Sequence, residues 1–266
     1  MATTEREAGK FRTNEIVVSS VSVRFSSGTS EVLALDKIDL KVRENEFVCV
    51  MGPSGCGKTT LLNAIAGFVR PTSGRIEIEG RPVVRAGPDR AVVFQADAVF
   101  PWMTVEENIG FSQRVRGKSE KEINQVVDRY IELVGLQEFR RAWPKELSGG
   151  MKKRVDLARG YAADPEVLLL DEPFGALDIM TKERLQEELR RLWLASPRTM
   201  IFITHDLEEA LYLGDRIIVM TPRPGRIESV HEPNFPHERD LSFKLDDKFI
   251  KSRREIHESM SAYAIT

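Results

Sequence analysis

The sequence predicts an α/β fold built on a mixed, mostly parallel sheet. Short and nearly continuous apolar runs are typical of strands that are covered on both faces. The clearest of these runs are Phe47–Met51, Ala91–Phe94, Val167–Leu170, Met200–Thr204 and Arg216–Met220. Between them, Lys182–Leu194 shows helical periodicity, with its leucines on one face. Residues 16–42 instead alternate between apolar and polar side chains, which predicts half-exposed antiparallel strands.

Length and composition are those of a folded protein of ordinary polarity. The 266 residues suffice for one large domain or for one domain with an inserted lobe. The net charge of −2 provides no overall basic surface, so we expect no nucleic-acid partner. The two cysteines, Cys49 and Cys56, suit a reducing compartment and have no metal-ligand spacing. No apolar run approaches the roughly 18 residues of a membrane span, so we expect any work at a membrane to require a partner.

We divide the chain into a polar N-terminal tail (1–15), a main domain (16–225) and a short C-terminal extension (226–266). The segment from about 98 to 161 is mostly helical in pattern and contains no clear central strand, which predicts a helical subdomain inserted in the core. The extension begins with a polar, proline-containing stretch and ends in a short helix near residues 247–263.

Two local patterns refine this assignment. Arg75–Gly80 alternates and ends at a glycine, which predicts another antiparallel strand. Asp206 and Glu209 have the spacing of a capping box, which predicts the start of a helix over Leu207–Leu213.

A phosphate-binding loop is the strongest local signal. A strand precedes the loop and a helix follows it, which disfavours the alternative of an ordinary glycine turn. Its glycines allow backbone N–H groups to face phosphate oxygens, Lys58 supplies a positive charge, and the Thr59 hydroxyl is a ligand for Mg²⁺. We therefore expect ATP and Mg²⁺ as cofactors. The loop consists of Gly52, Pro53, Ser54, Gly55, Cys56, Gly57, Lys58 and Thr59, followed by Thr60.

An acidic strand end complements this loop. The apolar run Val167–Leu170 leads directly into Asp171 and Glu172. Asp171 is predicted to hold Mg²⁺ through water, and Glu172 to polarise the attacking water as a general base. Two solvated acids at the end of a strand would be the structural alternative.

Three further features gain meaning from their order along the chain. Gln95 follows a strand, where its amide could contact Mg²⁺ or the attacking water, and His205 follows another, where its ring could contact the γ-phosphate. Ser148, Gly149 and Gly150 begin a helix whose free N–H groups form a second anion-binding end. Structural roles remain open for all three, including a simple helix cap at Ser148.

Together these residues resemble the nucleotide-binding subunit of an ATP-binding cassette (ABC) transporter, over roughly residues 16–225. The resemblance implies a P-loop NTPase core with an N-terminal antiparallel β subdomain and an inserted helical signature subdomain. It implies that Phe25 stacks on adenine, although a core position is equally open for this ring. It also implies that Asp178 lies at a dimer contact and that Ser148 and Gly150 reach the γ-phosphate bound by a second ATP-binding subunit, which we expect to be another copy of this chain.

Two positions depart from the family pattern. Met151 stands where many members have glutamine, so a ribose contact is not expected there, whereas the phosphate contacts of Ser148 are unaffected. Asp156 is also unusual, and we interpret it as part of a solvated helix face.

Within the family, the segments around Phe94–Asn108, Leu147–Arg154 and Met220–Ile227 resemble those of nitrate, sulfonate and taurine importers. This resemblance implies a peripheral ATPase on the cytoplasmic face of the inner membrane, served indirectly by an extracytoplasmic solute-binding protein. The alternatives are an importer of another small solute and a soluble ABC ATPase that acts as a switch on nucleic acid or in translation.

A docking segment for the permease is predicted within the helical subdomain, because aromatic and methionine side chains suit such an anchor. Packing inside the subdomain is the alternative. The docking segment consists of Ala96, Val99, Phe100, Trp102 and Met103.

Overall fold

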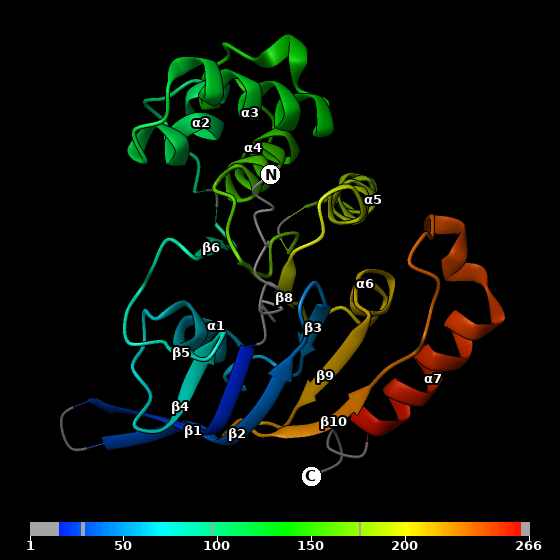
Figure 1. Cartoon of the computed structure of the whole chain (residues 1–266). Coiled ribbons are helices and arrows are strands. Elements are labelled where there is room, and N and C mark those ends of the chain that lie inside the picture. The colour runs from blue at the N-terminus through cyan, green and yellow to red at the C-terminus, as the bar shows by residue number, and fades with distance from the viewer. Residues whose placement is uncertain (1–15, 28–29, 97, 176, 262–266) are drawn as a thin grey trace, which may run out of the picture.

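The computed structural model describes residues 16–27, 30–96, 98–175 and 177–261, and its core is a six-stranded sheet (Figure 1). The strand order is β10-β9-β3-β8-β7-β6, and every neighbouring pair is parallel except β10 with β9. All five strands expected from the apolar runs are present, three of them with ends shifted by one residue. The run at 91–94 was expected to be a central strand, and this is wrong: β6 lies at the edge of the sheet and most of its residues are half-buried. The strands are β3 (Phe47–Met51), β6 (Arg90–Val93), β7 (Val167–Asp171), β8 (Thr199–Ile203), β9 (Arg216–Met220) and β10 (Ile227–His231).

A smaller antiparallel sheet covers one face of this core. Its order is β2-β1-β4-β5, and α1 (Lys58–Ala66) packs between the two sheets. The predicted strand at Arg75–Gly80 begins and ends earlier, because Glu79 and Gly80 adopt positive φ values of 51° and 70° and turn the chain. The strands are β1 (Ile16–Ser27), β2 (Ser30–Val42), β4 (Ser73–Ile78) and β5 (Arg81–Pro82).

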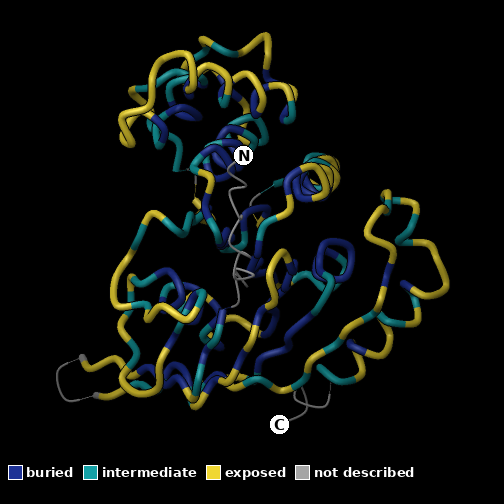
Figure 2. The backbone as a smooth tube through the Cα atoms, in the orientation of Figure 1, coloured by how far each residue is buried: buried dark blue, intermediate teal, exposed yellow. Residues whose placement is uncertain are grey.

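Strands β3, β7, β8 and β9 are buried on both faces, as their composition predicts (Figure 2). In β3, Val48 and Val50 contribute to the apolar core around α1, whereas Phe47, Cys49 and Met51 contribute to the core on the other face. That second core includes side chains of α5 (Ile179–Ala195) and α6 (Leu207–Leu213). Both layers therefore hold the sheet rigid beneath the loops that leave its carboxyl end.

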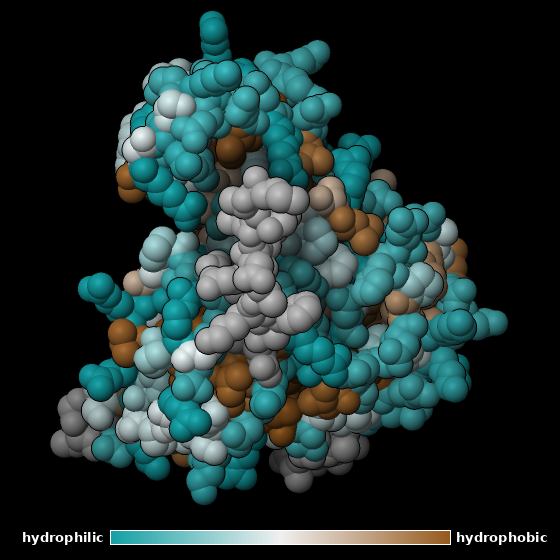
Figure 3. Space-filling view, viewed as in Figure 1, coloured by the Kyte–Doolittle hydropathy of each residue, from teal (hydrophilic) through white to brown (hydrophobic). Residues whose placement is uncertain are grey.

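A helical lobe stands apart from the sheets (Figure 1). Thr104 with Glu107 and Ser119 with Glu122 form reciprocal capping boxes that fix the starts of its first two helices. The lobe's outer surface is largely hydrophilic on the face seen in Figure 3. Its elements are α2 (Val105–Val115), α3 (Glu120–Leu133), the 3-10 turns η1 (Gln137–Phe139) and η2 (Pro144–Glu146), and α4 (Gly149–Ala162).

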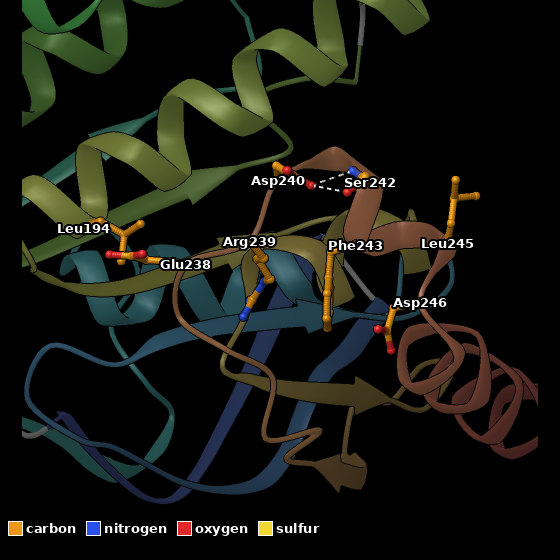
Figure 4. Close-up of a pocket in the computed structure, with 8 residues that line it drawn as sticks. All are labelled: Leu194, Glu238, Arg239, Asp240, Ser242, Phe243, Leu245 and Asp246. Carbon is orange, nitrogen blue, oxygen red and sulfur yellow. Dashed lines mark hydrogen bonds between the residues drawn. The ribbon is translucent and has the colours of Figure 1, made fainter.

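The C-terminal extension is joined closely to the core. It supplies β10, which was not predicted, then the 3-10 helix η3 (Leu241–Leu245) and α7 (Asp247–Ser261), which packs on α6. Arg190 of α5 donates to the carbonyl of His237 at 2.7 Å, and Arg239 donates to that of Gly214 at 2.8 Å. The polypeptide between β10 and α7 is thereby tied to α5 and α6 and walls a cavity of about 720 Å³ (Figure 4). The predicted tail 1–15 lies outside the described residues.

The predicted capping box at α6 is only half formed. Asp206 accepts hydrogen bonds from the N–H groups of Glu208 and Glu209, as a cap does. Glu209 does not return the bond: it is buried, and its carboxylate accepts from Thr204 and, at 3.2 Å, from Gln186. The reciprocal half of that prediction is wrong, because burial draws this side chain into the core.

In the parts of the chain that the structure describes, every helix is too short or too polar to span a bilayer.

Candidate active site

A cavity of about 520 Å³ opens beside the phosphate loop and gathers half of the predicted site residues. They come from β1, from the loop and first turn of α1, and from the segments after β6 and β7. The lining residues are Phe25, Val32, Ala34, Ser54, Gly55, Gly57, Lys58, Thr59, Thr60, Gln95, Glu172 and Arg223. The predicted site residues that do not line it are Gly52, Pro53, Cys56, Ser148, Gly149, Gly150, Asp171, Asp178 and His205.

The phosphate loop requires its glycines. Gly52, Gly55 and Gly57 have φ values of 154°, 75° and 103°, which side chains rarely permit. A Cβ on Gly57 would lie 2.7 Å from Leu35 Cδ2 and 2.9 Å from the Ala34 carbonyl oxygen. The loop therefore passes tightly over β2 into α1, and the first turn of that helix faces the cavity.

Lys58 is held within the loop itself. Its ammonium donates to the carbonyls of Gly52 at 2.8 Å and Pro53 at 3.0 Å, and the residue is buried. An ammonium with three donors can exchange such carbonyls for phosphate oxygens. Cys56 lies beneath it, and burial raises the pKa of the Cys56 thiol, against the opposing effect of Lys58, so this thiol stays protonated near neutral pH.

Asp171 and Thr59 meet at the carboxyl end of β7. The Thr59 hydroxyl donates to the Asp171 carboxylate at 3.1 Å. Burial raises the pKa of Asp171, the neighbouring Glu172 adds to the rise, and the bond from Thr59 opposes it. These are the hard oxygen donors that Mg²⁺ prefers. Among the described residues, no group of three or more acidic, histidine or cysteine side chains is placed to hold a metal ion. In nucleotide sites Mg²⁺ is commonly bound by one or two protein ligands together with phosphate and water.

Glu172 and His205 are hydrogen-bonded, with 3.1 Å between Glu172 Oε2 and His205 Nδ1. Glu172 has a φ of 43°, a conformation rare for a side-chain-bearing residue. The strained backbone is held because the Glu172 N–H donates to the Ile203 carbonyl at 3.0 Å and the Glu172 carbonyl accepts from Gly175 at 3.2 Å. His205 lies in an adjoining cavity of about 420 Å³, whose walls include Gly52 and Pro53. The pair therefore links the two cavities.

Phe25 and Gln95 reach the nucleotide-sized cavity from opposite sheets. Phe25 is 45% exposed, so the core alternative for this ring is wrong, and its stacking on adenine remains a prediction. Gln95 is also exposed, just after β6, and its carbonyl accepts a hydrogen bond from Lys153 at 3.2 Å.

The glycine-rich start of helix α4, at Ser148, Gly149 and Gly150, lies on a different surface from the phosphate loop. Ser148 caps α4 by accepting from the Met151 N–H at 3.3 Å, and it is exposed. Asp178 caps α5 in the same way, accepting from the Thr181 N–H at 3.0 Å, and these bonds hold the pKa of Asp178 below its usual value. A Cβ on Gly150 would lie 2.7 Å from Thr181 Cγ2. The starts of α4 and α5 are thus in contact, outside the cavity that holds the phosphate loop. The alternative of a helix cap at Ser148 is confirmed, and it leaves the exposed helix end available to a ligand.

The two departures from the family pattern have different outcomes. Met151 is partly buried against the apolar core. The interpretation of Asp156 as solvated is wrong: it is 1% exposed, and its carboxylate accepts from Arg159 at 2.6 Å. Charge compensation within the same helix face makes its burial possible.

The predicted docking segment is partly packed and partly exposed. Val99, Phe100 and Met103 are half-buried, and Phe100 contacts Phe111 with ring centroids 4.8 Å apart. Trp102 is 67% exposed and stacks on Phe100 at 5.6 Å. Three of the five residues of the docking segment are thus packed against the lobe, whereas Ala96 and Trp102 are exposed.

Sequence reasoning missed Arg223. This side chain lines the cavity from the loop after β9, which packs closely on the phosphate loop: a Cβ on Gly52 would lie 2.8 Å from the Met220 carbonyl oxygen. No local pattern around residue 223 signals a ligand, so only the tertiary contact reveals it.

Comparison with known proteins defines the class of this site. Residues 35–175 match the family described as ABC transporter. The chain is 45% identical to the taurine import ATP-binding protein TauB of Jannaschia sp., over 91% of this chain and 92% of that one. It is also 45% identical to the nitrate import ATP-binding protein NrtD of Synechococcus elongatus, over 85% and 84% respectively.

Solved structures agree with this match. A dimeric bacterial ABC transporter cassette superposes with a TM-score of 0.72 at 30% identity, covering 82% of this chain and 98% of that one. The same cassette in a dimeric post-hydrolysis state, bound to ADP and Pi, gives the same values. A nucleotide-binding ATPase is the class that the fold and the cavity define. More narrowly, this chain belongs to the ABC transporter family, with a P-loop NTPase core and an ATP-hydrolysing activity.

Proposed function

We propose that this chain is the ATP-hydrolysing subunit of an importer, and that two copies close on ATP to drive a separate permease. The observation that carries this proposal is the division of the site. Residues of the phosphate loop and Glu172 line one cavity, and Asp171 accepts a hydrogen bond from Thr59 of that lining, whereas Ser148 and Asp178 cap exposed helices outside it. A head-to-tail pair would place each exposed pair of caps against the phosphate loop of the other copy.

In this proposal, Lys58 leaves the carbonyls of Gly52 and Pro53 for phosphate oxygens when ATP binds. Thr59, Asp171 and Gln95 would hold Mg²⁺, which neutralises charge on the phosphates. Glu172 accepts a proton from the attacking water, and His205 orients its carboxylate through their hydrogen bond. Ser148 of the second copy completes the phosphate contacts. ATP binding therefore favours the closed dimer, and hydrolysis releases it.

Docking would place the subunit peripherally on the cytoplasmic face of the membrane. Trp102 supplies an exposed aromatic anchor, and Phe100 supports it from beneath. The predicted helical lobe thereby carries both the permease contact and the start of α4. The solute-binding protein of such a system acts on the other side of the membrane and contacts this chain only indirectly.

For the solute, we propose a small anion such as nitrate, a sulfonate or taurine. The support is the names of the relatives, which are taurine and nitrate import proteins at 45% identity over most of both chains. The solute would be recognised by the permease and the binding protein.

The test is purification of the chain with its native partners, followed by reconstitution of the complex in liposomes. Hydrolysis of ATP is measured with the solute-binding protein loaded in turn with taurine, nitrate, an alkanesulfonate or an uncharged sugar. Stimulation by one of the anions is the expected result. Stimulation only by the sugar would refute the proposal that the solute is a small anion. Isolation of the chain with ribosomes or nucleic acid, in place of a permease, would refute the proposal that it serves an importer.

A further inference from the structure

Three charged side chains, two of them buried and the third half-buried, lie between the start of α4 and the segment after β6. Lys153 and Asp156 are 2% and 1% exposed, and Lys153 Nζ lies 3.8 Å from Asp156 Oδ2. The third member, Arg159, donates to Asp156 Oδ1 at 2.6 Å. One carboxylate therefore balances two cations on a single face of the helix.

Both cations bind the segment that leaves β6. The Lys153 ammonium donates to the carbonyls of Phe94 at 2.9 Å and Gln95 at 3.2 Å. Arg159 donates to the carbonyl of Ala98 at 2.7 Å, and its guanidinium carbon lies 4.7 Å from the centre of the Phe100 ring. The group thus holds this segment at two places, beside Gln95 and beside the docking segment.

Burial of Lys153 and Asp156, with Arg159 half-buried beside them, is a costly way to hold a loop. Each ion loses its hydration, and a well-packed apolar contact of the same volume often gives equal or greater stability. Such a charged group instead fixes the geometry of the loop. The backbone carbonyls that follow β6 need hydrogen-bond donors, and the Asp156 carboxylate fixes the positions of the two side chains that donate to them. Gly160 brings the same helix against β6, since a Cβ there would lie 3.2 Å from both Val93 and Leu168.

We propose that Lys153 and Asp156 are positioning residues that join Gln95, the start of α4 and the docking segment into one moving unit. This inference rests on the proposed function, in which Gln95 responds to the nucleotide. A displacement of Gln95 at the cavity is then carried by Lys153 to α4, which begins at Ser148, and by Arg159 to Phe100 and the Trp102 ring stacked on it.

The test compares Lys153→Met, which keeps the length of the side chain and removes its charge, with Lys152→Met, the same change on the neighbouring and more exposed position. Asp156→Asn is the second variant, because it preserves shape if Lys153→Met does not fold. Two quantities are measured besides hydrolysis: affinity for radiolabelled ATP, and the ATP-induced fluorescence change of Trp102 in a Glu172→Gln background, defined as the component lost on Trp102→Phe.

We expect Lys153→Met and Asp156→Asn to lower the hydrolysis rate about 10- to 100-fold, as the loss of an orienting contact does, and to abolish the Trp102 response while ATP affinity is retained. When Lys153→Met is added to a chain that already carries Gln95→Ala, we expect no further fall in the hydrolysis rate. If Lys153 had only a structural role, the second substitution would lower the rate by the same factor as it does in the wild-type chain.

Two results would overturn the inference: a Trp102 response in Lys153→Met and Asp156→Asn equal to that of Lys152→Met, or no Trp102 response in the chain that retains Lys153. Failure of the proposed function is a different outcome, because there the unaltered chain would still hydrolyse ATP but would be isolated from cells with ribosomes or nucleic acid in place of a permease.

Discussion

Glu172→Gln is the substitution that isolates the chemical step. The exchange keeps the size of the side chain and its ability to hydrogen-bond His205 across 3.1 Å, but it removes the carboxylate that accepts a proton. The side chain is 21% exposed, so no buried charge is left unpaired and no cavity forms. We therefore expect a change in unfolding free energy within about 0.5 kcal/mol.

The rate should change far more than the stability. A positioned general base contributes about 10²–10⁴-fold, or roughly 3–5 kcal/mol of activation free energy. The affinity for ATP should persist, because the phosphate loop is unchanged. The ATP-bound dimer should accumulate, because hydrolysis no longer separates its two subunits.

Phosphate release, ATP binding and size-exclusion chromatography with ATP measure these three quantities. The matched control is Glu187→Gln, an exposed glutamate of α5. Turnover at the rate of this control would refute the assignment of Glu172 as the base, and loss of ATP binding would show that the residue serves the nucleotide instead.

Three other substitutions test separate parts of the account. Trp102→Ala removes the exposed indole above Phe100, so the permease-stimulated rate should fall toward the unstimulated rate; full solute uptake in liposomes would refute the docking role. Gly57→Ala places a Cβ 2.7 Å from Leu35 at a φ of 103°. We expect it to lower the unfolding free energy by about 1–3 kcal/mol and to abolish ATP binding. Normal affinity for ATP would contradict the geometry of the phosphate loop. Burial raises the pKa of Glu209 above 4.5, against the bond from Thr204, so the folded state holds this proton more tightly than the unfolded chain. The stability of the protein relative to Glu209→Gln should therefore decline as pH rises from 4.5 through the raised pKa, and a pH-independent difference in urea midpoint would contradict this.

The sheet could be predicted because its strands are covered on both faces and are therefore continuously apolar. The antiparallel strand β10 escaped prediction because its only apolar residues, Ile227 and Val230, are three positions apart and so do not repeat with the period of two that indicates a strand. Glu209 shows the same limit for helix caps: its spacing from Asp206 is that of a capping box, yet the core offers the carboxylate other partners.

The phosphate loop and the acidic strand end could be predicted because each is a local pattern with a fixed chemistry. Asp156 could not be placed by polarity alone, although Lys153 and Arg159 stand three residues before and after it, a spacing that a helix converts into contact. Arg223 had no local signal, because its place at the cavity depends on how the loop after β9 packs on the phosphate loop.

The central claim is that each site is shared between two copies, with Lys58 from one and Ser148 from the other. A chain with Lys58→Ala and a chain with Ser148→Arg are each expected to be inactive alone. When they are mixed in equal amounts, half of the dimers pair unlike chains, and each such dimer has one site in which both residues are intact.

The most direct measurement is the ATPase rate of this mixture. Shared sites predict recovery to roughly a quarter of the wild-type rate, the fraction of sites that are intact. A mixture as inactive as either chain alone, with mixed dimers present, would show that each site is contained in one subunit and would contradict the account.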